Sequence, residues 1–112
     1  MTYRAPVADM LTTLRDVAGL DQLIADGLAP DLEGGMAEAV LEEAGRFAND
    51  RLAPLNRVGD QTGSKLKDGV ITTPPGWKEA YRDWAEAGWN GLPAPVDFGG
   101  QGLPMVVQAA CI

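Results

Sequence analysis

The glycine cluster Gly99-Gly100-Gln101-Gly102 is the first segment whose residue types could do chemistry. Glycine-rich loops can present backbone N–H groups to a phosphate, and such loops usually follow a strand and open a helix. Here no strand pattern precedes the cluster, and neither a Lys-Ser or Lys-Thr pair nor a charged ribose partner follows at the expected spacing. The sequence therefore favours a tight turn, in which glycine lets the backbone pass close to other parts of the chain.

Other reactive side chains are scattered along the chain. Adjacent Glu42 and Glu43 would point about 100° apart on a helix, so they do not converge like a catalytic pair of carboxylates. Cys111 lies among apolar residues, which favours a buried and unreactive thiol. Lys65 and Lys67 could meet an anion, but a solvated loop is the simpler interpretation. With no histidine and one cysteine, the sequence predicts no Ser–His or Cys–His catalysis and no metal site.

The composition limits the partners that the chain can have. Its 112 residues, of which 46% are hydrophobic, suffice for one folded domain at most. The net charge of −7 opposes binding to nucleic acid and to anionic membrane surfaces. The N-terminus lacks the pattern of a signal peptide, and no apolar run approaches the roughly 20 residues that span a bilayer. We therefore expect a cytoplasmic protein, with no membrane or nucleic-acid partner.

The elements that would position these residues begin with two short helices. Pro6 can open the first helix, and Gly19 is expected to end or kink it. A second helical pattern follows over residues 20–28, with Asp21 as its cap.

The third helix has the clearest pattern. Its apolar residues form one stripe from about Asp31 to Leu52, which indicates a helix packed on one side. Its opposite face offers a Glu42–Arg46 pair at i,i+4 spacing, and Pro54 is expected to terminate the helix.

Residues 55–73 are predicted to form a long connection, because glycine, asparagine and aspartate residues interrupt any helical or strand periodicity of apolar residues there. Residues 70–73 could form a short extended piece, although one strand alone cannot make a sheet. A further helix is expected after Pro74-Pro75, with Trp77, Tyr81 and Trp84 on one face. Such a stripe is usually core, whereas Trp89 could serve an interface.

The connector from Gly88 to Pro104 leads to a last apolar segment, Met105–Ile112, which is predicted to be a helix that needs burial on several sides. A chain that ends within this helix looks cut, so we expect a piece of a longer protein. The fold class is all-α, with up-and-down helices and a long connecting loop.

Several short motifs occur in a characteristic order. They are Gly88-Trp89, Gly91-Leu92, Pro95 and Phe98-Gly99-Gly100-Gln101-Gly102-Leu103; Leu52-Ala53-Pro54-Leu55 with Asp60, Thr62 and Gly63; and Tyr3-Arg4-Ala5-Pro6 with Asp9-Met10. The first group resembles the end of the N-terminal helical domain of acyl-CoA dehydrogenases. The second resembles that family's helix end and following loop, and the third the extra N-terminal segment of a bacterial branch with longer subunits. Val96-Asp97 and Phe98 depart from the family's usual acidic residues and tyrosine, without disturbing the turn.

The resemblance implies a division of this chain and a larger enzyme around it. Residues 1–30 would be an N-terminal extension of short helices, and residues 31–112 an N-terminal helical domain that is incomplete at its C-terminal end. A middle β domain and a C-terminal four-helix domain would follow, and the enzyme would be a homo-oligomer.

The chemistry implied by the resemblance is the α,β-dehydrogenation of an acyl-CoA thioester. In this family FAD is held mainly by the later domains, a glutamate outside the N-terminal domain removes the α-proton, and flavin N5 takes hydride from the β-carbon. Electrons then pass to an electron-transfer flavoprotein. We therefore assign no catalytic or cofactor-binding residue here, and we expect FAD in the full-length enzyme and an inactive, flavin-free fragment.

The N-terminal domain of this family helps to wall off the acyl pocket. The nearest candidates for that wall are Gly99, Gly100, Gln101, Gly102, Leu103 and Pro104. Two alternatives stay open. A free-standing helical interaction module would expose Met105–Ile112 or pair it in a homodimer. An acyl-CoA oxidase or a nitroalkane-oxidase-like relative would share the fold and FAD.

Overall fold

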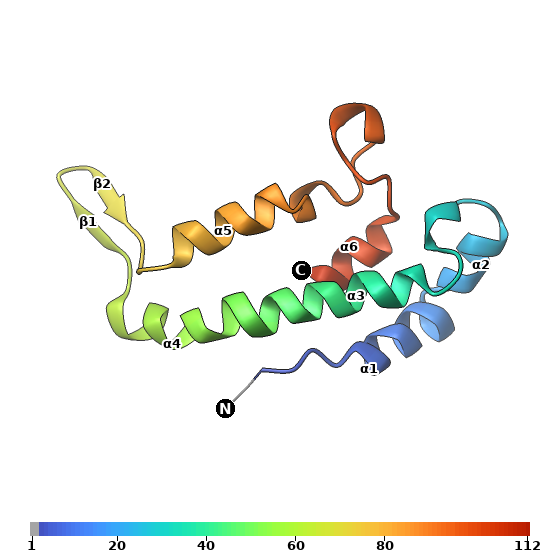
Figure 1. Ribbon diagram of the computed structural model, residues 1–112, viewed down its shortest axis with the longest axis horizontal. Coiled ribbons are helices and arrows are strands. Elements are labelled where there is room, and N and C mark those ends of the chain that lie inside the picture. Colours follow the sequence, from blue (N-terminus) through green and yellow to red (C-terminus); the bar gives the residue numbers. More distant parts are fainter. Residues whose placement is uncertain (1–2) are drawn as a thin grey trace.

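The computed structural model describes residues 3–112 as an elongated, mainly helical molecule (Figure 1). Its extents are 54 × 36 × 19 Å and its radius of gyration is 16.7 Å. A compact chain of this length would have a radius of gyration of about 13 Å, so the helices are spread rather than gathered around one centre. The all-α expectation is confirmed, with one small hairpin added.

The helices and strands follow one another along the chain, and the longest connection, residues 87–104, separates the last two helices. They are α1 (Val7–Thr12), α2 (Leu20–Ala25), α3 (Met36–Phe47), α4 (Ala53–Thr62), β1 (Lys65–Lys67), β2 (Val70–Thr72), α5 (Trp77–Glu86) and α6 (Met105–Cys111). π-Helical turns extend α1 over Thr13–Val17 and join α3 to α4 over Ala48–Leu52. None of the helices within residues 3–112 is long and apolar enough to cross a lipid bilayer.

Helix α2 begins at a glycine and not at a carboxylate cap. Gly19 takes a left-handed conformation with φ of 73° and precedes the first residue of α2. The prediction that Asp21 caps this helix is wrong, because Asp21 already lies inside its first turn. Its carboxylate instead lies 3.7 Å from the Arg15 guanidinium. The first two residues of the expected extension, Met1 and Thr2, lie outside the described part of the chain.

The third helix starts later than its apolar stripe suggested. Residues Pro30–Leu32 form a 3₁₀ turn, and α3 begins only at Met36. Gly34 and Gly35 separate the two with φ of 66° and 81°, a backbone conformation that a right-handed helix does not contain.

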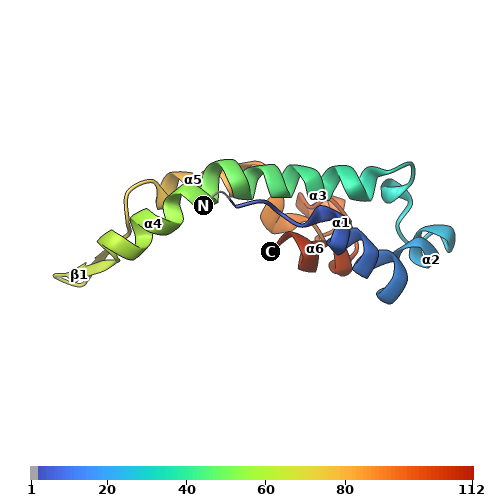
Figure 2. The same cartoon turned by 90° about the horizontal axis from the view of Figure 1, so that it is seen from below.

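Pro54 does not terminate this helix, contrary to the prediction. It lies in the first turn of α4, directly after the π-helical turn Ala48–Leu52. Proline is tolerated at such a position because its missing N–H removes little from the ladder of hydrogen bonds. Helices α3 and α4 therefore form one continuous rod from Met36 to Thr62, about 40 Å long, along most of the 54 Å length of the molecule (Figure 2).

The predicted long connection over residues 55–73 is also corrected, since α4 and a β-hairpin occupy most of it. Strands β1 and β2 pair antiparallel, with Leu66 opposite Ile71. Asp68 and Gly69 make the turn with φ of 51° and 77°, and two central residues with positive φ suit a two-residue hairpin. The extended piece seen in the sequence therefore has a partner strand three residues upstream.

The core lies at one end of the rod. Buried residues from α1 and its π-helical extension, from α2, α3 and α6, and from the segment between α2 and α3 form its main cluster: Leu11, Leu14, Leu20, Ala29, Leu32, Ala37, Leu41 and Val107. A second cluster joins Ala44, Trp89 and Leu92. Trp89 is only 8% exposed and stacks on Trp84 with 5.1 Å between ring centroids, so it is a core residue and not an exposed interface residue. Residues on both sides of position 30 contribute to the main cluster. The predicted division of the chain into an N-terminal extension (residues 1–30) and a helical domain (residues 31–112) stays a prediction.

Candidate functional site

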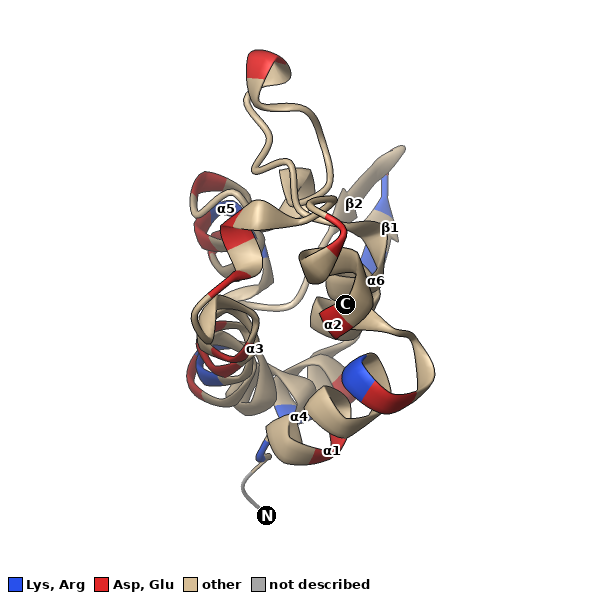
Figure 3. Cartoon of the chain, turned by 90° about the vertical axis from the view of Figure 1, so that its right-hand side faces the viewer, with Lys and Arg blue, Asp and Glu red and all other residues tan. Residues whose placement is uncertain are grey.

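The connector folds back on itself into a closed loop. Its two arms are joined by backbone hydrogen bonds from Gln101 N–H to Gly91 O (3.1 Å) and from Leu103 N–H to Leu92 O (2.9 Å). A 3₁₀ turn over Val96–Phe98 makes the tip. The loop projects from the body of the molecule at the top of Figures 1 and 3. Backbone hydrogen bonds thus join the two arms of the loop, and Leu92 and Leu103 at its base pack against the core.

The N–H groups of the glycine cluster are all used inside this loop. Those of Gly99, Gly100, Gln101 and Gly102 each donate to a backbone carbonyl between residues 91 and 96, at 2.9–3.1 Å. A phosphate-binding loop must leave such groups pointing outward. The interpretation of the cluster as a tight turn is therefore supported by the hydrogen bonds.

Gly100 is the point of closest approach between the two arms. It is buried, and a Cβ at this position would overlap the carbonyl group and the side chain of Ala94. Gly99 and Gly102 have φ of 83° and 65°, so the loop also needs glycine for conformational reasons at these two positions. The spacing of the three glycines thus follows from the shape of the loop.

The last two residues of the predicted wall connect the loop to α6. Leu103 is half-buried and packs against both core clusters. The carbonyl of Pro104 accepts a hydrogen bond from Val107 N–H at 3.0 Å, which starts the helix. The six predicted wall residues therefore form the lead-in to α6, and none of them lines the apolar cavity between the rod and α5.

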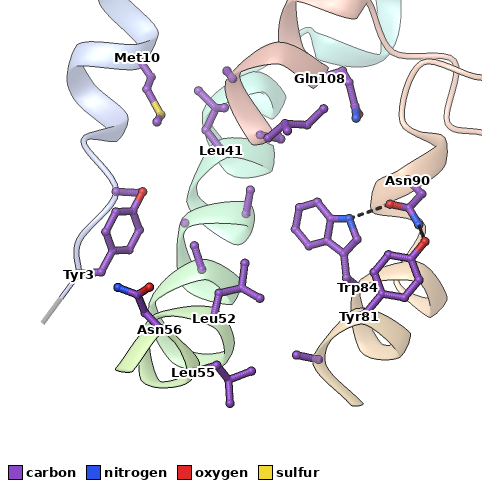
Figure 4. Close-up of a pocket in the computed structure, with 18 of the residues that line it drawn as sticks. Tyr3, Met10, Leu41, Leu52, Leu55, Asn56, Tyr81, Trp84, Asn90 and Gln108 are labelled. Atoms are coloured by element: carbon purple, nitrogen blue, oxygen red, sulfur yellow. Dashed lines mark hydrogen bonds between the residues drawn. The ribbon is translucent and has the colours of Figure 1, made fainter. Parts of the chain in front are cut away.

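That cavity, of about 690 Å³, is an apolar groove between the rod, α5 and α6 (Figure 4). The rod contributes Leu41, Ala44, Ala48, Leu52 and Leu55; α5 contributes Trp77, Ala80, Tyr81 and Trp84; and the α6 end contributes Gln108, Ala110, Cys111 and Ile112. The N-terminal part of the chain borders the groove as well, through Tyr3, Ala5 and Met10, and Ala5 lies against Gly45 of the rod. Figure 4 shows Trp84 and Tyr81 facing Leu52 and Leu55 across the space.

Three hydrogen bonds organise the α5 side of the groove. Trp84 Nε1–H donates to Asn90 Oδ1 at 2.9 Å, and Asn90 Nδ2–H donates to the Tyr81 hydroxyl at 3.3 Å. Trp77 Nε1–H donates to Leu55 O on α4 at 3.3 Å. The Trp84 ring also lies against Phe47, with centroids 5.2 Å apart. The aromatic side chains are thus held in fixed positions along the groove.

The prediction that the aromatic stripe is core is wrong for two of its three members. Trp77 is 42% exposed and Tyr81 is 65% exposed, while Trp84 is half-buried. The periodicity located the inner face of α5 correctly. However, that face borders the groove, and the described residues do not fill it.

Charged groups lie around the groove and not in it. Arg51 pairs with Asp83 and so ties the rod to α5 outside the lining. Arg46 forms its ion pair with Glu43, at 2.5 Å, and not with Glu42 as predicted. Both lysines of the hairpin are exposed on β1, and not in a loop as expected (Figure 3).

The Cys111 thiol in the lining is a poor nucleophile. Burial raises the pKa of the Cys111 thiol, which keeps it protonated at neutral pH. No group of three or more potential metal ligands occurs within residues 3–112. The lining is mostly apolar and is suited to holding apolar groups; among the described residues, no Asp, Glu, Lys or Arg side chain lines it.

Comparison with known proteins relates almost the whole chain to two enzymes. It is 40% identical over 110 residues to 3-methylmercaptopropionyl-CoA dehydrogenase of Ruegeria pomeroyi, and 27% identical over 107 residues to a broad-specificity linear acyl-CoA dehydrogenase of Mycobacterium tuberculosis. These alignments cover 98% and 94% of this chain but only 19% and 18% of the two relatives. The chain thus spans about a fifth of their length. No family model matches it.

Proposed function

Because this chain is related over nearly all its length to acyl-CoA dehydrogenases, we propose that it is one segment of such an enzyme. The two relatives support the expected resemblance to this family. The observation that carries the proposal is the 40% identity, which extends over 98% of the chain and is not confined to one motif. The parent protein would oxidise an acyl-CoA thioester between its α and β carbons, would be a cytoplasmic homo-oligomer, and would pass electrons to an electron-transfer flavoprotein.

FAD would supply the redox chemistry of the parent enzyme, but the residues described here do not fit a flavin site. The glycine cluster has no outward N–H group for a pyrophosphate, because all four donate within the loop. The groove holds no charged side chain that could face a phosphate. We therefore assign flavin binding and the catalytic base to the remainder of the enzyme, and no reaction step to this chain.

The role proposed for this chain is to shape the acyl pocket through the connector. Residues 99–104 form the rigid arm that leads into α6, and the tip of the same loop presents Val96 and Phe98 to the outside. Phe98 is 85% exposed, and an aromatic side chain in this position needs an apolar neighbour. A wall of the acyl pocket would provide that neighbour in the complete enzyme.

The full-length protein tests this proposal directly. We expect it to purify with bound flavin, or to take up FAD after reconstitution, and to convert an acyl-CoA into a 2-enoyl-CoA. A Phe98→Ala variant should raise KM for long acyl-CoA substrates more than for short ones, with Val17→Ala on the exposed end of the first helix as the matched control. A full-length protein that neither contains nor accepts flavin would contradict the proposal. Hydrogen peroxide formed in step with product would assign it to the oxidase relatives.

A non-catalytic interaction module is the second candidate. It is favoured by the apolar end of the chain, where Met105 is 68% and Ile112 is 89% exposed. A gene with a stop codon directly after Ile112, together with a dimer in solution that buries α6, would support this function. An open reading frame that continues over the length of the relatives supports the enzyme.

A further inference from the structure

Asn90 stands directly before Gly91 at the start of the connector. The chain has three asparagines, and the other two precede larger residues: Asn49 is followed by an aspartate and Asn56 by an arginine. In an Asn-Gly pair the backbone nitrogen of the glycine can attack the carbon of the side-chain amide, because glycine lacks the Cβ that shields this nitrogen in other residues. The pair therefore has the residue types for a spontaneous modification of the chain.

The folded chain holds both reacting groups of this pair in other bonds. The amide of Asn90 points back toward α5, where its Oδ1 accepts from Trp84 Nε1–H at 2.9 Å and its Nδ2–H donates to the Tyr81 hydroxyl at 3.3 Å (Figure 4). The N–H of Gly91 donates to Gly88 O at 3.1 Å. A nucleophile and its target react when they are aligned at about 3 Å, so these hydrogen bonds must open first.

The backbone conformation opposes the reaction as well. Residues Trp89–Gly91 form a 3₁₀ turn, in which the backbone has helical dihedral angles. Closing a five-membered ring between the Asn90 side chain and the next backbone nitrogen requires Asn90 to leave the helical range of ψ. The residue is nevertheless exposed to solvent, so water can reach it. The pair is thus reactive by its chemistry and is held back by its conformation.

We propose that Asn90 is a modification site, at which opening of the Trp89–Gly91 turn starts an irreversible deamidation. The Gly91 nitrogen gives up its proton and bonds to Asn90 Cγ, the Cγ–Nδ2 bond breaks, and Nδ2 leaves as ammonia with that proton. Water then adds to one of the two carbonyl carbons of the resulting ring, which opens to aspartate or isoaspartate. Water is the only co-reactant, and Asn90 is exposed to it.

The isoaspartate product changes the base of the connector. It adds one carbon atom to the main chain at position 90, directly before Gly91. The Gly91 carbonyl accepts hydrogen bonds from Ala94 N–H and from Gln101 N–H, each at 3.1 Å, so its displacement weakens the link between the two arms. The aspartate product keeps the normal backbone and an acceptor for the Trp84 indole, and it disturbs the connector less. Deamidation would therefore loosen the connector from α5 as the protein ages.

The test is to measure deamidation residue by residue in the full-length protein. Wild type and variants are incubated at mildly alkaline pH, both in native buffer and in denaturant, and peptide mapping by mass spectrometry follows the mass gain at each asparagine. Asn56 is the internal control, because an arginine follows it. In denaturant Asn90 should react at least about ten-fold faster than Asn56, since the glycine nitrogen is unshielded.

Two variants separate the chemistry from the conformation. Tyr81→Phe removes one partner of the Asn90 amide, so native deamidation should be about two- to five-fold faster, the factor that corresponds to one neutral hydrogen bond. Its rate in denaturant should equal that of the wild type. Gly91→Ala is the matched chemical control, because the added Cβ makes only ordinary contacts with Gly99 and Gly100. In denaturant it should slow the reaction at Asn90 about ten-fold.

Equal rates at Asn90 and Asn56 in denaturant, or an unchanged rate in Gly91→Ala, would overturn the proposed chemistry. A native Tyr81→Phe protein that reacts no faster than the wild type would overturn the control by hydrogen bonding. Aged wild-type protein, separated from fresh protein by its added negative charge, gives the structural readout. Hydrogen exchange at Gln101 should be at least about five-fold faster in the isoaspartate fraction, and an unchanged rate there would refute the loosening of the connector.

Discussion

Replacing Gly100 with alanine should damage the connector more than the same change at a neighbouring glycine. A Cβ at position 100 would overlap the carbonyl group of Ala94, which belongs to the backbone and cannot rotate away. The two arms of the loop must then separate. This weakens cross-loop hydrogen bonds such as that from Gly102 N–H to Ala94 O, now 2.9 Å long.

The expected loss follows from two contributions. Over-packing of a tight site costs about 1–3 kcal/mol, and each weakened backbone hydrogen bond costs about 1 kcal/mol. We therefore expect Gly100→Ala to lower the free energy of unfolding by about 2–4 kcal/mol. Gly99→Ala is the matched control, because its Cβ would meet nothing within 4 Å and the only cost is its φ of 83°. That left-handed conformation costs about 1 kcal/mol for alanine.

Urea unfolding of the three proteins, followed by tryptophan fluorescence, measures the difference. Trp89 lies just before the loop and stacks on Trp84, so the fluorescence reports on this end of the molecule. Hydrogen exchange at Gly102 and Leu103 supplies a local readout and should become faster in Gly100→Ala. If Gly100→Ala were as stable as Gly99→Ala, the close approach of the two arms would not hold the loop together, and our explanation of the glycine spacing would be refuted.

Three further changes test other parts of the structure. Gly69→Ala places a side chain at φ of 77° with open space around it, so the hairpin alone should lose about 1 kcal/mol, seen as weakened cross-strand NOEs with unchanged helical circular dichroism. Asn90→Ala removes the acceptor of the Trp84 indole and should lower the free energy of unfolding by about 1–2 kcal/mol, whereas Asn90→Asp, which keeps an acceptor, should lose less. The raised pKa of the Cys111 thiol means that the folded state holds this proton more tightly than the unfolded state. The free energy of unfolding should therefore fall as pH rises through the ordinary thiol pKa of about 9, and Cys111→Ala should abolish that fall.

The helices that the sequence predicted best are those whose period is uninterrupted. The apolar stripe within residues 31–52 and the one after Pro74-Pro75 correspond to α3 and α5, and Pro104 precedes α6 as expected. Periodicity reports which face of a helix is apolar, and that information is local to the segment. It could not show that a π-helical turn lets the rod continue past Pro54, because this depends on how the backbone adjusts its hydrogen bonds.

The hairpin could not be predicted because each of its strands is too short to be recognised without the other strand. Asp68-Gly69 is a strong turn dipeptide, but the strands on either side have three residues each and no alternation long enough to stand out. Only their pairing, with Leu66 opposite Ile71, makes them strands.

For the candidate site too, one part could be predicted from the sequence and another part could not. The glycines of the connector predicted a tight turn, and the backbone hydrogen bonds of residues 91–103 explain why. The groove was not predicted, since it arises where α5, α6 and the rod meet in space. Trp77 and Tyr81 were expected to be buried because their spacing is that of a core face; whether such a face is covered depends on elements elsewhere in the chain.

Anaerobic titration of the full-length protein with acyl-CoA thioesters of different chain lengths tests the central claim most directly. If this chain is a segment of an acyl-CoA dehydrogenase, at least one thioester should bleach the absorption of the oxidised flavin and yield the 2-enoyl-CoA in equal amount. A flavin-loaded protein whose spectrum no acyl-CoA changes, and which forms no enoyl product, would contradict the account.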